Sequence, residues 1–220
     1  MSSSAPRPIP NKIFLWLLPF LALSGLGCIH QRSLSTEIEF LPSPDYNQLV
    51  ATYGRCRGKG TVISQGGMQG QLTFLFTSSG DSTFLLFKDL LGRKTAFLSL
   101  VQDELIAWDI LQDRVYNRND LQALYPWIGW LNPLEFTSML WGVVPATLPD
   151  KEGEYNFERS SGRISLVTKP GSQGNLIQQI MFENPDKKIK ITLNITLREL
   201  GASYPRLKGI GSRILAEVSP

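Results

Sequence analysis

The sequence predicts an α+β fold in which a curved antiparallel sheet carries helices over its concave face, an arrangement with room for a hollow between them. Short apolar strands follow one another through tight turns over residues 61–117, which is typical of an antiparallel meander. Two helical segments then interrupt the strands, and strands resume after them. Such a sheet has a surplus of large apolar residues on its inner face, and two or three short helices cover that face without filling it.

The first 27 residues are expected to be a signal peptide. Arg7 and Lys12 precede an apolar run at 13–26, and a basic start followed by an apolar stretch of this length is typical of a secretory signal. The alternative is a one-pass membrane anchor. The run disfavours an anchor because it is shorter than the ~20 apolar residues that cross a bilayer, and because Pro19 interrupts it.

Cys28 follows Gly27 at the end of this run. The arrangement resembles the lipobox of bacterial lipoproteins, in which the cysteine is lipidated and becomes the new N-terminus. The resemblance implies that Cys28 is the lipid attachment site, that residues 28–44 form a lipidated tether, and that the domain spans 45–220. Ile29 follows the cysteine instead of aspartate, which in that class of protein implies anchoring in the outer membrane, facing the periplasm.

Composition narrows the class of function. The chain is 42% apolar and 19% charged, with a formal charge of +3 that includes Arg7 and Lys12 of the expected signal. The rest is nearly neutral, so no nucleic-acid partner is predicted. The single histidine, His30, lies in the expected tether, so neither a catalytic triad nor a histidine-rich metal site is predicted. We therefore expect no enzyme activity, no metal and no cofactor, and we expect Cys56 to be a small buried strand residue.

The domain begins with a short amphipathic helix over 45–53. Its apolar residues recur at helical spacing: Tyr46, Leu49, Val50 and Tyr53. The strands expected after this helix span residues 61–63, 71–77, 83–88, 94–100, 105–110 and 114–117. The third of these strands is apolar on both faces.

Capping patterns predict two helices in the middle of the chain. Asn119, followed three residues later by Gln122, resembles a capping box that opens a helix over 120–127. At Asn132 a cap is followed directly by proline and, three residues on, by glutamate, so a second helix is expected to run to Trp141.

Strands are expected again in the second half, at 155–159, 163–169, 176–183 and 189–198. The last one is apolar at every second position from Ile189 to Leu197 and polar between them. Strict alternation predicts one buried face and one solvated face. The tail from Gly201 has no pattern that predicts an element.

Several segments together resemble the LolB family of outer-membrane receptors for lipoproteins. FLLFKDLLG at 84–92 is similar to the family's strand and protruding turn, and LWGVVP at 140–145 is similar to the close of its central helix. Residues 58–76 match the first two strands, and 177–198 match more loosely. The order and spacing of these short motifs carry the resemblance.

The resemblance implies that the curved sheet is a half-barrel, closed by helices around an apolar cavity. It implies a lipid-anchored receptor that accepts the acyl chains of lipoproteins from a soluble periplasmic carrier of the LolA kind and inserts them into the outer membrane. It also implies that Leu90 and Leu91 protrude at a turn and assist membrane insertion; the alternative for Leu91 is a buried turn residue. Seven large apolar residues are candidates for the cavity wall: Phe74, Phe76, Phe84, Leu86, Phe97, Trp108 and Trp141.

Other interpretations stay open. The seven wall candidates form a filled core if there is no cavity. The alternative function is that of a structural envelope lipoprotein, or of another lipid-binding lipoprotein without transfer activity. An enzyme acting through carboxylates such as Asp109 and Asp113 is the third class, although these residues have the spacing of ordinary turn residues.

Overall fold

The computed structural model describes residues 43–66, 69–80, 82–124, 132–145, 154–159 and 162–218. All of them belong to one unit, Phe40–Pro220. The expected signal peptide, Cys28 and nearly all of the expected tether lie outside the described residues. Within the described ranges, no helix has the length and apolar character needed to cross a bilayer.

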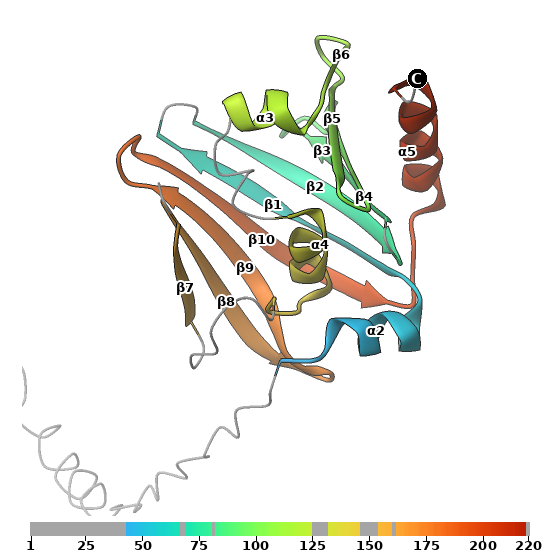
Figure 1. Ribbon diagram of the computed structural model, residues 1–220, viewed down its shortest axis with the longest axis vertical. Coiled ribbons are helices and arrows are strands. Elements are labelled where there is room, and N and C mark those ends of the chain that lie inside the picture. Colours follow the sequence, from blue (N-terminus) through green and yellow to red (C-terminus); the bar gives the residue numbers. More distant parts are fainter. Residues whose placement is uncertain are drawn as a thin grey trace, which may run out of the picture. The chain divides into compact units, whose positions relative to one another are not determined.

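Ten antiparallel strands form one curved sheet in the order β6-β5-β4-β3-β2-β1-β10-β9-β8-β7 (Figure 1). Their bounds are β1 Cys56–Gln65, β2 Gly70–Ser79, β3 Ser82–Lys88, β4 Lys94–Val101, β5 Glu104–Asp109, β6 Arg114–Tyr116, β7 Glu154–Arg159, β8 Gly162–Gly171, β9 Gly174–Asn184 and β10 Ile189–Leu200. β6 and β7 stand at the two ends of the order, and no pairing joins these strands, so the described sheet is an open half-barrel. The predicted fold class is confirmed.

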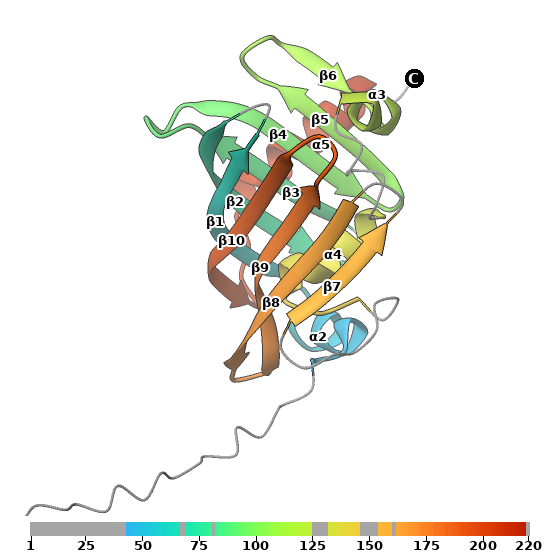
Figure 2. The ribbon, with the colours of Figure 1, turned by 90° about the vertical axis from the view of Figure 1, so that its left-hand side faces the viewer.

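Two helices, α2 (Tyr46–Tyr53) and α4 (Pro133–Trp141), pack on the concave side of the sheet (Figures 1 and 2). The α4 helix begins with the predicted capping box, because Asn132 accepts from the backbone of Glu135 at 2.6 Å and the Glu135 side chain accepts from the backbone of Asn132. At its other end, Trp141 is fully buried and its Nε1 donates to Ser78 Oγ at 2.8 Å. Tyr46 of α2 meets the Trp141 ring edge-on, with the centroids 5.8 Å apart.

The α3 helix, Arg118–Leu124, begins earlier than predicted. Its cap is Asn117, whose Oδ1 accepts from Asp120 N at 3.0 Å while Asp120 Oδ2 accepts from Asn117 N at 3.1 Å. The capping box is therefore formed by Asn117 and Asp120, whereas we expected it from Asn119 and Gln122. The predicted continuation at 125–127 lies outside the described residues.

The α5 helix, Pro205–Val218, lies on the convex face of the sheet (Figure 1). Its Leu207 is buried against Phe84 and Phe97 of β3 and β4. Gly211 comes closest to the sheet, because a Cβ at that position would lie 2.2 Å from the Phe84 ring. The sequence predicted no element for this tail, so α5 is an addition to the helices predicted on the concave face.

The alternation of β10 shifts at a β-bulge. Lys59 of β1 pairs with Leu197 and Gly60 pairs with Ile195, so Thr196 is an extra residue. Beyond it, Arg198 instead of Leu197 points to the concave side. Its guanidinium donates to two backbone carbonyls, those of Leu140 at 2.7 Å and Ile177 at 2.6 Å. The predicted alternation is confirmed up to Ile195 and is wrong after it.

Candidate binding site

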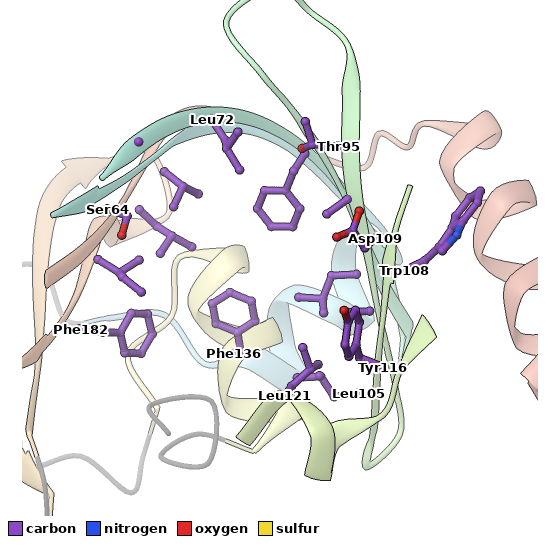
Figure 3. A pocket seen from close by; sticks show the side chains of 18 of the residues that line it. Ser64, Leu72, Thr95, Leu105, Trp108, Asp109, Tyr116, Leu121, Phe136 and Phe182 are labelled. Carbon is purple, nitrogen blue, oxygen red and sulfur yellow. The ribbon is translucent and has the colours of Figure 1, made fainter. Parts of the chain in front are cut away.

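A cavity of about 580 Å³ lies between the concave face of the sheet and α4 (Figure 3). This volume falls within the range of small-molecule sites, roughly 300–1,000 Å³. Its walls come from both halves of the sheet and from α3 and α4, and they are mainly aliphatic and aromatic: Val62, Leu72, Phe87, Leu98, Phe136, Phe182, Ile191 and Leu193.

The cavity lies between two filled cores on the concave side. One core, around Phe74 and Trp141, joins α2 and α4 to β1–β5. The other, around Met139, joins α4 to β8–β10. Phe136 and Val62 are only partly buried, pack against both cores and border the cavity. A single helix of nine residues thus separates the two cores and leaves the space beside it unfilled.

The cavity reaches the surface at the end of the sheet where β1 turns into β2 and β5 turns into β6. Gln69, Gly70 and Gln71 border it and are exposed, and so is Leu111, at 69% of its surface. The β3–β4 turn lies at this same end, because Lys88 at the end of β3 pairs with Thr73 near the start of β2. The mouth and that turn therefore lie at one edge of the half-barrel.

Polar groups border the wall formed by β4, β5 and β6. Asp109 carries the only charged side chain among the described residues that line the cavity. Its Oδ1 accepts from Leu111 N at 2.9 Å and from Gln112 N at 3.0 Å, which holds the turn into β6. Thr95 also borders the cavity, and its buried Oγ1 has no hydrogen-bond partner.

Three of the predicted wall residues do not border the cavity. Phe74, Phe76 and Trp141 are fully buried in the core beneath α2 and α4. The ring of Tyr46 packs edge-on against the Trp141 ring. Ser78 Oγ accepts a hydrogen bond from the Trp141 indole N–H. For these three residues the filled-core interpretation is the correct one.

Three others lie on the wrong face of the sheet. Phe84, Leu86 and Phe97 are packed against α5 on the convex side, so the prediction that they line the cavity is wrong. Side chains alternate along a strand, and in β3 it is Leu85 and Phe87 that face inward. Periodicity gives the two sets of side chains but does not say which set faces the hollow.

Trp108, the seventh predicted wall residue, is among the residues that border the cavity. Its indole ring, however, points away from the cavity toward α5 (Figure 3). Its Nε1 donates to Asp113 Oδ1 at 3.1 Å. Asp113 is thus engaged with this ring, whereas Asp109 borders the cavity, so the two carboxylates do not form a site together.

The wall residues that the sequence missed include Phe136, Phe182 and Leu193. Leu193 belongs to the alternating stretch of β10, so its inward direction was predicted without its role in a cavity. The two phenylalanines stand on elements that were predicted correctly, α4 and β9. No local pattern distinguishes a phenylalanine that borders a hollow from one that fills a core.

Leu90 and Leu91 protrude at the β3–β4 turn, with 73% and 79% of their surface exposed. The buried-turn alternative for Leu91 is therefore wrong. Asp89 Oδ1 accepts from Leu91 N at 3.0 Å and from Arg93 N at 2.9 Å, and Arg93 Nε donates to Asp89 Oδ2 at 2.6 Å. Desolvation is the largest single influence and raises the pKa of Asp89, but the hydrogen bonds and charge of Arg93 and the hydrogen bond from Leu91 N together outweigh it, so the pKa lies below its ordinary value.

Cys56 is a fully buried residue at the start of β1, as predicted. Burial raises the pKa of its thiol to about 12, although the charge of Arg198 opposes the rise. Burial likewise lowers the pKa of Arg198 to about 10. The thiol is therefore protonated and unreactive at neutral pH. Among the residues described, no group of histidine, cysteine and acidic side chains is placed to hold a metal ion.

No protein-family model and no curated protein matches the chain. Among solved structures, the chain is similar to a DUF1329 family protein from Desulfovibrio piger, with a TM-score of 0.47, 8% identity and coverage of 72% of this chain and 90% of that one. A LolA superfamily protein from Nitrosomonas europaea gives a TM-score of 0.32 at 6% identity, over 73% of this chain and 96% of that one. A putative outer membrane lipoprotein-sorting protein domain from Vibrio parahaemolyticus gives 0.35 at 6% identity, over 76% and 95%. Likenesses at these scores carry no conclusion about function.

Proposed function

We propose that this protein binds acyl chains in the cavity and, as a lipid-anchored receptor at the outer membrane, passes the chains of lipoproteins into that membrane. The observation that carries the proposal is an apolar space of about 580 Å³ that the protein's own side chains leave unfilled. Each methylene that leaves water for such a space contributes about 0.8 kcal/mol. An unbranched chain gains this contribution along its whole length.

The β3–β4 turn supports the second half of the proposal, delivery into a membrane. Leu90 and Leu91 expose most of their surface to water, and a pair of exposed leucines at a turn tip is typical of a surface that is transiently buried elsewhere. Lys88 and Lys94 pair directly across the two strands behind the tip. Their charges suit anionic lipid head groups.

The sequence supports the anchor. The resemblance of residues 25–28 to a lipobox favours lipidation of Cys28, and Ile29 after it favours retention in the outer membrane, facing the periplasm. A soluble carrier of the LolA kind is the expected donor of the acyl chains. If the β3–β4 turn has no part in delivery, the protein is a lipid-binding lipoprotein without transfer activity.

Blocking the cavity tests the proposal. The full chain is used with Cys28→Ser, so that no attached lipid competes for the site, and binding of the apolar dye N-phenyl-1-naphthylamine is followed by fluorescence. Ala107 borders the cavity, and Ala107→Trp should weaken binding by about tenfold or more, because the indole occupies the space of two or more methylenes. Ala51 is an exposed residue of α2, so Ala51→Trp is the matched control and should bind like the parent chain.

Circular dichroism of both variants checks that they keep the fold. A parent chain that does not bind the dye, or an Ala107→Trp variant that is folded and binds as well as the control, would show that the cavity is not a site for apolar ligands.

A further inference from the structure

The only charge among the described residues that line the cavity is negative. Asp109 contributes a carboxylate to a space whose other described lining residues are apolar or uncharged. In Figure 3 this carboxylate is turned toward the cavity, on the same wall as Tyr116. Asp109 lies directly across from Ala96, the residue after Thr95, in the pairing of β4 with β5. Asp109 and Thr95 are thus polar lining residues on neighbouring strands, and the lining has uncharged polar residues elsewhere, among them Ser64, Gln71 and Asn132.

The hydrogen bonds of Asp109 leave half of its carboxylate available. Both backbone donors, Leu111 N and Gln112 N, bind Oδ1. The second oxygen has no hydrogen bond to any described residue. Thr95, on the neighbouring strand β4, also borders the cavity, and its buried Oγ1 also lacks a partner. A buried polar atom without a partner is costly, so a bound group that supplies hydrogen bonds here is stabilised.

A carboxylate at an apolar site discriminates between the polar ends of ligands. It attracts an ammonium group and accepts hydrogen bonds from hydroxyl and amide donors, whereas it repels a second carboxylate, and the repulsion is stronger next to apolar walls than in water. No described cation lines the cavity to offset this repulsion.

We propose that Asp109 makes the cavity selective for amphiphiles whose polar end is not anionic and donates hydrogen bonds, and that it excludes free fatty acids. This inference rests on the proposed function, in which the cavity binds acyl chains. An acyl chain in amide linkage has no free carboxylate and carries an N–H donor, so the selection favours it. A chain in ester linkage has no donor at the linkage but is not repelled, whereas free fatty acids, which would otherwise compete for the same apolar space, are rejected.

Ligands with the same chain and different ends test the inference on the full chain carrying Cys28→Ser. Dodecylamine, dodecanol and dodecanoate, all below their aggregation limits at pH 7.5, are compared as displacers of the bound dye. Dodecylamine and dodecanol should displace the dye at concentrations about tenfold lower than dodecanoate. The amine and the alcohol separate charge attraction from hydrogen bonding, because only the amine should lose affinity as salt is added.

Asp109→Asn removes the charge and keeps an oxygen for the turn. In this variant dodecanoate should bind several-fold more tightly, dodecanol should change little, and the preference should fall to within about twofold. Glu104→Gln is the matched control, since it removes one negative charge from an exposed position of the same strand and should keep the preference of the parent chain.

The outcomes are distinguishable. If the dye does not bind the parent chain, the proposed function itself fails. If the dye binds but the three ligands displace it equally, or if folded Asp109→Asn keeps the original preference, the cavity stands and the selectivity is overturned. Should Asp109→Asn not fold, the ranking on the parent chain decides, with dodecyl sulfate as a second anion that must also bind weakly.

Discussion

At the scale of single residues, Arg198 shows how a side chain on the sheet positions a helix. Its guanidinium binds Leu140 O in the last turn of α4 and Ile177 O of β9. The carbonyls at a helix C-terminus carry partial negative charge, so a cation there is stabilising. Gly142 ends the helix with φ 96° and lies against the same guanidinium, at a distance that leaves no room for a Cβ. The helix that borders the cavity is thereby held at its C-terminal end.

Leu91 offers the sharpest test of delivery. Because 79% of its surface is exposed, Leu91→Glu should change the free energy of unfolding by no more than about 0.5 kcal/mol. Dye binding should also stay the same. Transfer of a bound acyl ligand to phosphatidylglycerol vesicles should slow several-fold, because a charged residue at the tip opposes insertion.

Leu134 of α4, which is 53% exposed, provides the control, and Leu134→Glu should leave transfer unchanged. Equal transfer rates for the two variants would mean that the β3–β4 turn has no part in delivery. Unfolding of Leu91→Glu would show that this leucine supports the fold.

At the scale of elements, the helices differ in how much of each could be predicted. The α4 helix carries its start and its end in its own residues, Asn132, Glu135 and Gly142, so it was predicted to the residue. The α5 helix was missed, because its stability comes from Phe84 and Phe97, which lie more than a hundred positions earlier. The bulge at Thr196 was missed for the same reason, since it is a property of the pairing with β1 and not of β10 alone.

Two glycines of α5 test how closely this helix packs on the sheet. Gly211→Ala places a methyl group 2.2 Å from the Phe84 ring, and such overpacking should lower the free energy of unfolding by about 1–3 kcal/mol. At Gly209 a Cβ meets nothing within 4 Å, so Gly209→Ala should raise it by about 0.5–1 kcal/mol through helix propensity.

Urea unfolding of the two single variants measures both effects. Two changes of the same sign and size would show that α5 does not pack against Phe84 as the structure has it.

At the scale of the whole molecule, the half-barrel was predictable, whereas the pairing of β1 with β10 that joins its two halves and the wall of the cavity were not. Alternation along β3 separates Leu85 and Phe87 from Phe84 and Leu86, but both sets are equally apolar. The curvature of the whole sheet decides which set is concave. The size of the hollow depends further on how far α2 and α4 extend across it, and no single segment of the sequence contains that information.

If the cavity is empty without its ligand, occupancy should stabilise the entire domain. At a free ligand concentration of about 100 times Kd, binding to the folded state alone adds about 2.7 kcal/mol to the free energy of unfolding. Dodecanol should therefore raise the melting temperature of the parent chain in a concentration-dependent way. The Ala107→Trp variant should show a smaller rise, and an equal rise in both would place the ligand elsewhere.

The central position of β1 and β10 has a consequence for how the chain folds. These strands pair residues such as Arg57 and Glu199, whose side chains also bond at 2.6 Å, across almost the full length of the domain. The hairpins on either side of them are local and close quickly, whereas this pairing has high contact order and forms slowly. Until β10 has emerged and docked, β1 is an uncovered edge strand beside a finished meander, and such edges recruit other chains. Strand β10 therefore protects β1, and we expect the chain to be prone to aggregate until these two strands have paired.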